Sequence, residues 1–422
     1  MISSRVFQAA LASCLSCAVA LGQSQADLEE RARVLLRETP LIDGHNDVPW
    51  QYNKRVKNQI SKIDLRADLS LLDPPMHTDI PRLRGGGVGG QFWSVYVPVI
   101  FKGSQGIRAV IEQIDVARRL IDAYPDVFEL ALTADDIERI HRGGKVASLL
   151  GMEGGHSIGN SLAALRMFHG AGARYMTLTH SENTEWADSC TDEPASDGLS
   201  RFGVEVVREM NRLGMMVDIS HVHPLTMHDV LDVAEAPVIF SHSSSRGVAN
   251  HPRNVPDDVA SRLAAKDGVI MITFVSGFIN ATFGEYSGRE NEENDRLTVL
   301  HPEDPALVKS LLETWRSSNP MPPNATLEEV ANHFDHLRAL IGTDHIGLGG
   351  DYDGTDHLPI GLEDVSKYPA LFAELYRRGY TDDDIRKIAG QNLLRVMRKV
   401  ESVADRLQRE RGPSDARIDD YD

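Results

Sequence analysis

Residues 146–153 read VASLLGME, an apolar run that ends in a carboxylate. A short, continuous apolar run of this kind is typical of a strand that is buried on both faces of a sheet. Seven similar runs recur along the chain, so we predict eight strands. The other seven are Leu41–Gly44, Gln91–Val97, Tyr175–Thr179, Met215–Ser220, Val238–Ser241, Val269–Phe274 and Ile346–Gly350.

Stretches with the 3.6-residue apolar period of a helix lie between many of these runs. Strands that alternate with helices along the whole chain predict an α/β fold, a TIM (β/α)₈ barrel. Two long connections, Val48–Gly90 and Ser276–Asp344, are expected to carry inserted loops or small helices, and Thr381–Lys399 is expected to form a closing helix. The helical stretches are Ile107–Tyr124, Ser161–Gly170, Phe202–Leu213 and Leu225–Glu235.

The chain of 422 residues shows no internal repeat and no low-complexity linker. Barrels with insertions commonly use this length for one domain. We therefore expect a single barrel domain over residues 27–400 and a charged, solvated tail over residues 401–422.

Acidic residues outnumber basic residues by 62 to 44, which gives a formal net charge of -18. A field of this sign repels nucleic acid and anionic membrane surfaces, so we expect no nucleic-acid partner. After residue 26 no stretch is long and apolar enough to span a bilayer, so no transmembrane span is expected. The charged tail also lacks the hydrophobic segment of a GPI signal.

The N-terminus has the layout of a secretory signal, because Arg5 precedes the apolar run Val6–Leu21 and a polar stretch follows. Cleavage near Gly22 or Ala26 would release an exported protein, either periplasmic or secreted. The alternative is a frayed amphipathic helix. The sequence LASC at residues 11–14 also resembles a bacterial lipobox, which would make Cys14 a lipid anchor.

Residues that bind metals or move protons follow the predicted strands at their carboxyl ends, where barrel enzymes hold their reactive groups. A chance scatter of 16 histidines would not select strand ends this often. The pattern predicts a metal site of the metallo-dependent hydrolase type. The residues are His45 and Asp47 after the first strand, Glu153 after the third, His180 after the fourth, His221 after the fifth, His242 after the sixth and Asp351 after the eighth.

His45 and Asp47 lie two positions apart, so both side chains point the same way on an extended chain and can hold one cation. Glycines flank Glu153 and leave room for other groups near its carboxylate. Two cations that share a site need a bridging anion. Because no predicted strand offers a lysine at its carboxyl end for carbamylation, Glu153 is the expected bridge.

His221 and His242 follow adjacent strands, and neutral imidazoles suit Zn²⁺, so both are candidates for a second metal position. The alternative is a pair of hydrogen-bonded core histidines. His223 shares a face with His221 and stays open as a rival ligand. Several other histidines are expected to be structural or exposed: His156, His228, His251, His333 and His336.

Eight ordered motifs between Pro40 and Leu394 resemble the membrane (renal) dipeptidase family of zinc-dependent dipeptidases. So many motifs in one order make the resemblance highly specific. The motifs are LIDGHNDVPW, GGQFWSVYVP, GMEGGHSIGN, YMTLTHSENTEWAD, VDISHV, PVIFSHSSSR, RNVPDD and GLGGDYDG.

The resemblance implies a two-metal centre. His45, Asp47 and Glu153 would hold the first zinc ion. Glu153, His221 and His242 would hold the second. The chain would then bind two Zn²⁺ ions bridged by Glu153, in agreement with the bridge expected from the strand ends.

The resemblance also implies three residues that meet the substrate. His180 in LTHS would contact the scissile carbonyl and stabilise the tetrahedral intermediate. Arg253 in RNVPDD would hold the substrate carboxylate, and Asp351 in GGDYD would protonate the leaving amine. Simpler roles stay open for two of them: a loop cap for Asp351, with Asp353 as its competitor, and a surface ion pair of Arg253 with Asp257 or Asp258.

One position departs from the family pattern. Glu182 stands where animal members, as the resemblance implies, carry a disulfide cysteine. Of Cys14, Cys17 and Cys190, only Cys190 would remain after cleavage, so no intrachain disulfide is expected. These features favour a microbial form, either soluble or lipid-anchored. The resemblance alone implies a homodimer.

The expected function is the hydrolysis of dipeptides by a metal-bridged hydroxide, with Asp351 passing a proton to the departing nitrogen. One alternative is a related two-metal amidohydrolase that acts on N-acyl amino acids, β-lactams or lactones. A more distant alternative is a non-catalytic exported binding protein.

Overall fold

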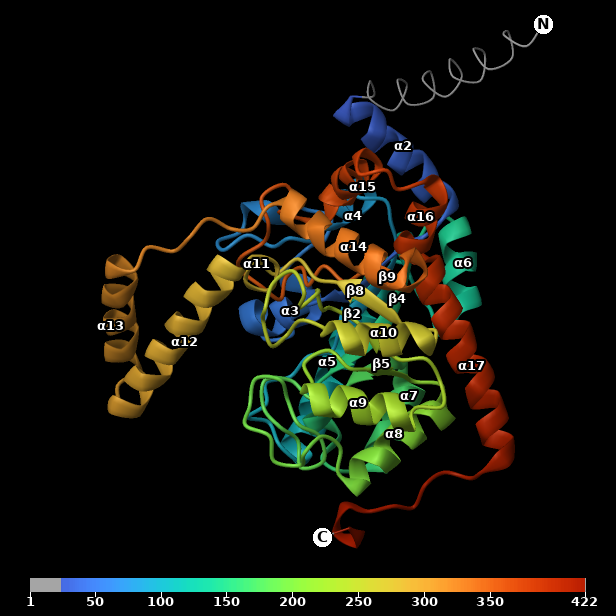
Figure 1. Ribbon diagram of the computed structural model, residues 1–422, viewed down its shortest axis with the longest axis vertical. Helices are drawn as coiled ribbons and strands as arrows, with labels where there is room; N and C mark the ends of the chain where they lie inside the picture. Colours follow the sequence, from blue (N-terminus) through green and yellow to red (C-terminus); the bar gives the residue numbers. More distant parts are fainter. Residues whose placement is uncertain (1–23, 422) are drawn as a thin grey trace, which may run out of the picture.

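The computed structural model describes residues 24–421 of the chain. The predicted secretory signal and the lipobox with Cys14 therefore lie outside the described residues, apart from residues 24–26. Nine parallel strands run through the described part (Figure 1). They are β1 (Leu41–Asn46), β2 (Val88–Ser94), β3 (Phe128–Leu130), β4 (Val146–Glu153), β5 (Ala173–Thr177), β6 (Met216–Asp218), β7 (Ile239–Phe240), β8 (Val269–Ile272) and β9 (Ile346–Leu348).

Eight of these strands close into a barrel. The ring runs from β1 through β2, β4, β5, β6, β7 and β8 to β9, which pairs again with β1. The step from β2 to β4 is a regular parallel ladder from Gly90 opposite Ala147 to Ser94 opposite Gly151. All eight predicted strands occupy the ring, with ends shifted by a few residues, so the predicted TIM barrel is confirmed.

The ninth strand, β3, lies outside the ring. It pairs with the first residues of β4, and β5 takes the same edge of β4 further along. No strand was predicted at residues 128–130.

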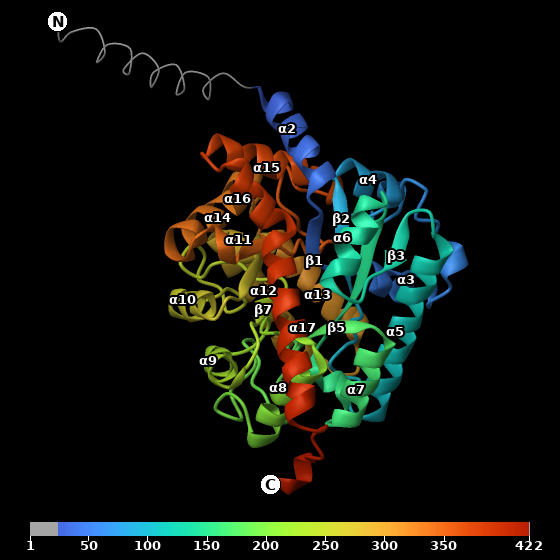
Figure 2. The same cartoon turned by 90° about the vertical axis from the view of Figure 1, so that its right-hand side faces the viewer.

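Helices surround the barrel and occupy parts of the two long connections (Figures 1 and 2). The predicted helical stretches all form, and each begins or ends at a local signal, such as the Ser200 cap and the left-handed Gly214 that bound α8. The helices are α2 (Gln25–Glu38), α3 (Val48–Val56), α4 (Ile80–Gly85), α5 (Ser104–Ala123), α6 (Ala134–Arg142), α7 (Leu162–Ala171), α8 (Arg201–Leu213), α9 (Pro224–Val233), α10 (Asp257–Ala265), α11 (Ser276–Ile279), α12 (Ala281–Leu300), α13 (Pro305–Ser318), α14 (Leu327–Ile341), α15 (Tyr368–Arg377), α16 (Asp382–Arg386) and α17 (Asn392–Glu410). Within residues 24–421 no helix combines the length and the apolar character needed to cross a membrane.

The closing helix is longer than predicted. α16 leads through a π-helical turn, Lys387–Gln391, into α17, which ends at Glu410. Leu407 is fully buried and Ala404 nearly so, because this part of α17 packs on the body of the protein. The helix end predicted at Lys399 lies too early, and residues 401–410, expected in a solvated tail, belong to this helix.

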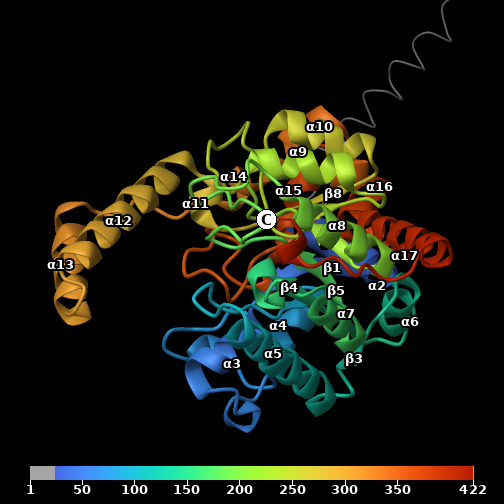
Figure 3. The same cartoon turned by 90° about the horizontal axis from the view of Figure 1, so that it is seen from below.

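The second long connection carries a helical arm. α12 and α13 form a hairpin that projects from the body (Figures 1 and 3). The two helices are joined by the Arg316–Glu290 ion pair and by their own small apolar cluster. The cluster consists of Leu297, Val308 and Leu312.

Candidate metal centre

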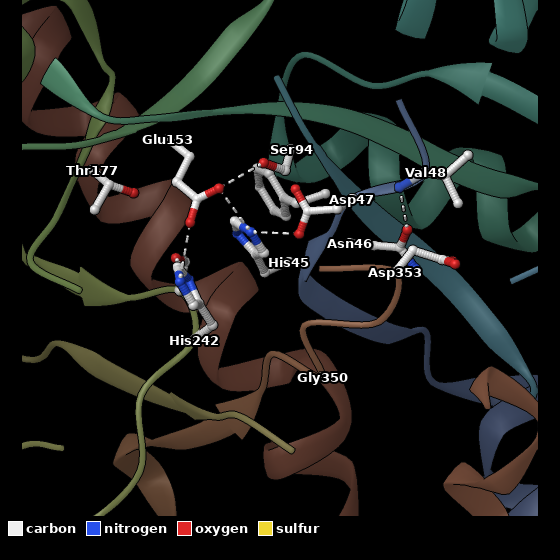
Figure 4. Close-up of polar contacts among 12 residues, drawn as sticks. His45, Asn46, Asp47, Val48, Ser94, Glu153, Thr177, His242, Gly350 and Asp353 are labelled. Atoms are coloured by element: carbon white, nitrogen blue, oxygen red, sulfur yellow. Dashed lines mark hydrogen bonds and ion pairs between the residues drawn. The ribbon is translucent and has the colours of Figure 1, made fainter. Parts of the chain in front are cut away.

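The predicted site residues converge at the carboxyl edge of the barrel. Each one lies at the end of its strand or within three residues after it, so the closed ring brings the side chains together. Figure 4 shows His45, Asp47, Glu153 and His242 in contact there. The complete set is His45, Asp47, Glu153, His180, His221, His242 and Asp351.

Glu153 lies at the centre, and its two carboxylate oxygens face different partners. Oε2 is 3.4 Å from Nε2 of His45 and accepts a hydrogen bond of 3.2 Å from the hydroxyl of Ser94. Oε1 is 3.2 Å from Nε2 of His221 and 3.4 Å from Nε2 of His242. One carboxylate therefore connects two separate sets of donors.

Asp47 and Asp351 lie on the His45 side of this carboxylate. Nε2 of His45 is 3.3 Å from Oδ2 of Asp47, and Asp351 offers an oxygen within 4.8 Å of ligand atoms of both residues. On the other side, Nε2 of His180 is 3.6 Å from Oε1 of Glu153. His180 and Asp351 are thus close enough to the predicted ligands to act on the same bound molecule.

A tyrosine hydroxyl fixes the imidazole of His45. Its Nδ1 lies 2.9 Å from the hydroxyl of Tyr175, which donates to the carbonyl of Gly44 at 3.0 Å. Since that hydroxyl donates its proton to a carbonyl, it accepts a hydrogen bond from Nδ1, and Nε2 is the nitrogen that a cation can bind. The Tyr175 ring fits only because residue 151 is glycine, where a Cβ would lie 2.0 Å from the ring.

His242 is held by a second relay of the same kind. Its Nδ1 is 2.7 Å from the hydroxyl of Ser241, which donates to the buried carboxylate of Asp218 at 2.6 Å. Asp218 also accepts hydrogen bonds from the backbone N–H groups of Ser220 and Ser241. Neither Tyr175 nor Asp218 was singled out from the sequence, although a carboxylate inside the apolar run Met215–Ser220 is a signal that could have marked Asp218.

The protonation states suit metal binding. Burial alone would raise the pKa of Glu153, but the imidazoles around it hold that pKa well below its usual range. Burial lowers the pKa of His221 and His242 well below the usual value, so both imidazoles are neutral near pH 7. Burial, reinforced by the charges of Asp47 and Glu153, raises the pKa of Asp351 well above its usual range. Burial alone would lower the pKa of His45, but Tyr175, Glu153 and Asp47 raise that pKa well above its usual value, so a cation at Nε2 of His45 would take the place of a proton. The centre therefore combines two neutral imidazoles, a charged carboxylate and one carboxyl group with a raised pKa.

Side-chain contacts distinguish the members of two pairs that spacing left open. His221, Asp351 and Asp353 all adopt left-handed conformations, with φ of 66°, 59° and 66°, so the backbone alone does not separate Asp351 from Asp353. The side chains of His221 and Asp351 reach the cluster of candidate ligands. His223 instead caps α9 by accepting from the N–H of Leu225. Asp353 turns toward the loop after α3, where it accepts from the N–H of His77.

Arg253 is buried beside the centre, with 3% of its surface exposed. Its guanidinium donates to the hydroxyl of Ser243 at 3.1 Å and to the carbonyl of His242 at 3.0 Å. Nε is buried and has no hydrogen-bond partner among the described residues. The surface pairs with Asp257 and Asp258 do not form, because these carboxylates bind His336 and His228.

An open cleft of about 620 Å³ gives access to this centre. Asp47, Glu153, His180, Arg253 and Asp351 all line it. A small molecule in the cleft can therefore touch the carboxylates, an imidazole and the guanidinium at once.

The remaining histidines and Cys190 lie outside the cluster. His333 is a core residue that accepts from the N–H of Ser245, and His156 is buried just beyond Glu153. Burial raises the pKa of the Cys190 thiol, which keeps it protonated and unreactive.

A parallel barrel that holds carboxylates and imidazoles at its carboxyl edge defines a metal-dependent hydrolase. The model of the membrane dipeptidase family, peptidase family M19, matches residues 29–411 of this chain. The chain belongs to this family of metallopeptidases.

Solved structures of similar proteins share the fold. The dipeptidase AC, a metallopeptidase of family M19, has a TM-score of 0.70 and 25% identity, covering 86% of this chain and 99% of its own. A metallopeptidase from Rhodobacter sphaeroides, liganded with a phosphinate mimic of L-Ala-D-Ala, has a TM-score of 0.70 and 24% identity, covering 86% and 99%. The probable dipeptidase PvdM from Pseudomonas aeruginosa has a TM-score of 0.75 and 22% identity, covering 90% and 100%.

Proposed function

We propose that this chain is a zinc-dependent dipeptidase that holds two zinc ions bridged by Glu153. The observation that carries the proposal is that the two carboxylate oxygens of Glu153 face different donors. Oε2 faces His45, and Oε1 faces His221 and His242. A carboxylate that points its two oxygens at separate donor sets suits two cations, whereas a single cation would leave one set unused.

The chemistry of the donors fits zinc. Neutral imidazoles and carboxylates are its usual ligands in hydrolases, and the two hydroxyl relays leave the Nε2 atoms of His45 and His242 free to bind. Nε2 of His45 is buried without a hydrogen-bond partner in the described chain, as expected for an atom that binds a cation. His45 and Asp47 would hold one ion and His221 and His242 the other. When bound, the pair of ions would activate water and polarise the peptide carbonyl.

The chain's own residues would position a dipeptide in the cleft. Arg253, rigidly held and with an unused donor, would bind the substrate's terminal carboxylate. His180 would donate to the scissile carbonyl oxygen. Asp351, whose pKa is raised well above its usual range by burial, would give a proton to the departing nitrogen. A carboxylate anchor in the same cleft as the metal ligands would explain a limit of two residues.

The test is a metal count joined to a substrate panel. We expect about two zinc ions per chain, loss of activity on prolonged chelation, recovery with Zn²⁺, and turnover of dipeptides. Glu153→Gln should lose both zinc and turnover, whereas Glu129→Gln, a surface carboxylate paired with Arg139, should keep both. Hydrolysis of N-acyl amino acids or lactones in place of dipeptides would establish the alternative amidohydrolase, and no turnover of any substrate would establish a binding protein.

Export and dimer formation also remain proposals. α2 begins at Gln25, and Ser24 forms a capping box with Asp27. A cut near Gly22 would keep this cap and a cut after Ala26 would remove it, so we favour the earlier site. Mass spectrometry of the exported protein would give the N-terminus and reveal lipidation of Cys14, and light scattering would give the oligomeric state.

A further inference from the structure

A second cavity adjoins the metal cleft and is not used by the chemistry described above. Its volume is about 680 Å³, and it lies between the loop after β7, the start of α11 and the arm helix α12. Arg253 and Phe278 line both hollows, so the two lie side by side.

The cavity is apolar in its depth and polar at its mouth. Among its lining residues, Ala249 and Phe283 are buried, and the ring of Phe283 lies 5.2 Å from the ring of His357. The exposed polar residues of the lining include Asn250, Glu285 and Asn291, whereas the charged Arg253 is buried where the cavity meets the cleft. A deep apolar floor under a polar rim favours an apolar group over a charged one.

Glycines shape the wall that α12 contributes. A Cβ at Gly284 would lie 2.6 Å from the carbonyl oxygen of Gly277, so the glycine allows α12 to approach α11 closely. A Cβ at Gly288, which also lines the cavity, would meet no heavy atom within 4 Å. Space is therefore left open beside this part of the arm.

Arg253 stands at the boundary between the cleft and the cavity. Its guanidinium carbon lies 5.2 Å from the centre of the Phe278 ring, and the His251 ring lies 4.6 Å from that same ring. A carboxylate held by Arg253 would place the adjoining α-carbon at this boundary. The metal centre lies on one side of that carbon, and the apolar cavity lies on the other.

We propose that the cavity is the binding site for the side chain of the substrate's C-terminal residue, and that the enzyme prefers dipeptides ending in an aromatic or large aliphatic residue. The proposal rests on the dipeptidase function proposed above. In this proposal α12, the first helix of the arm, takes a direct part in substrate choice.

The test compares the substrates Ala-Phe, Ala-Ala and Phe-Ala, with either enantiomer of the C-terminal residue. The wild type should have a kcat/KM for Ala-Phe at least about tenfold above that for Ala-Ala, the range of discrimination given by an apolar pocket. Gly288→Leu should fill the open space, and Leu is a better helix former than Gly, so folding should not suffer. The variant should lower the Ala-Phe to Ala-Ala ratio by about tenfold.

Gly170→Leu is the matched control, because Gly170 is also a helical glycine whose Cβ would meet nothing within 4 Å, and it lies in α7 outside both hollows. It should keep the wild-type ratio. An unchanged Ala-Phe to Ala-Ala ratio of kcat/KM in Gly288→Leu would overturn the proposal. An equal fall in kcat/KM for Phe-Ala and for Ala-Phe in this variant would overturn it as well. Dipeptide turnover without preference would overturn this inference alone, whereas absence of any dipeptide turnover would overturn the dipeptidase function as well.

Discussion

Arg253 combines a buried guanidinium with a donor that no described residue uses, and this predicts its contribution to catalysis. Removing one partner of a buried charge pair costs about 2–5 kcal/mol, which is roughly 30-fold to several thousand-fold in kcat/KM. Arg253→Ala should show a loss in this range and keep its zinc. Arg262→Ala removes an arginine that pairs with Asp232 at the surface and should change kcat/KM little.

Substrate choice shows whether Arg253 binds the terminal carboxylate. The wild type should strongly prefer a dipeptide with a free carboxylate over its C-terminal amide. Arg253→Ala should lose most of that preference. A variant that discriminates as well as the wild type would show that Arg253 is not the anchor.

Asp351 is predicted to act as a proton donor and not as a zinc ligand. Asp351→Asn keeps the size of the side chain but removes the transferable proton. Both zinc ions should remain, and kcat should fall by about 10²- to 10⁴-fold with a smaller change in KM. Because an Asp351 oxygen lies within 4.8 Å of the donor atoms of His45 and Asp47, metal analysis is essential. Zinc loss would assign Asp351 to the ligands.

The Ser241 hydroxyl is predicted to set the zinc affinity through His242. Ser241→Ala removes the link between Nδ1 of His242 and Asp218, and such outer hydrogen bonds are worth about 10- to 100-fold in metal affinity. Competition with a chelator should show this loss, and Ser241→Thr should restore most of the affinity. Ser244→Ala removes a buried hydroxyl that binds the carbonyl of Thr273 and serves as the control. Equal affinity in Ser241→Ala and Ser244→Ala would contradict the relay.

Individual residues of the site show which of its parts the sequence alone can predict. The strand-end rule brought His45, Glu153 and Asp351 together correctly, because closure of a parallel barrel fixes where carboxyl ends meet. The rule says nothing about hydroxyl groups that reach across the ring, so Tyr175 and Ser241 were not anticipated. Their contacts depend on side-chain direction and on the space above Gly151, which a linear pattern does not record.

Among the elements, α17 makes the clearest prediction for stability. Leu407 is fully buried although it lies in a segment rich in charge. Leu407→Ala should lower the free energy of unfolding by about 2–5 kcal/mol, the usual cost of such a truncation in a core. Leu300→Ala, at an arm position that is 57% exposed, should change it by less than about 0.5 kcal/mol. Urea unfolding compares the two, and equal stabilities would show that the end of α17 does not hold the fold.

The elements that sequence reasoning did not place share a physical cause. β3 has three residues and takes its place only because an edge of β4 is free there. The arm helix α12 is largely exposed, so its sequence carries little apolar periodicity to detect. The ring strands were predictable even where they are as short as β7, because they are buried and burial imposes an apolar run, whereas β3 is only partly buried. Burial of one face likewise made α5, α7, α8 and α9 predictable.

For the whole molecule, buried histidines predict how stability depends on pH. Burial lowers the pKa of His156, His169, His251 and His333 to about 4. In the unfolded chain these imidazoles take up protons below about pH 6.5, so the unfolded state binds more protons between about pH 4 and 6.5. Asp43, whose pKa burial raises to about 6, acts in the opposite direction, but it is one group against four imidazoles. The free energy of unfolding of the metal-free protein should therefore rise with pH across this window. Denaturant unfolding at several pH values tests this, and a flat profile would contradict it.

Closure of the ring through the pairing of β1 with β9 has a consequence for synthesis. A growing chain presents His45 and Asp47 early, but the strand that completes their surroundings, together with Asp351, emerges last. A product released by a stalled ribosome before β9 would thus carry most of the ligands without the frame that aligns them. Copies that end before β9 should therefore be inactive instead of weakly active.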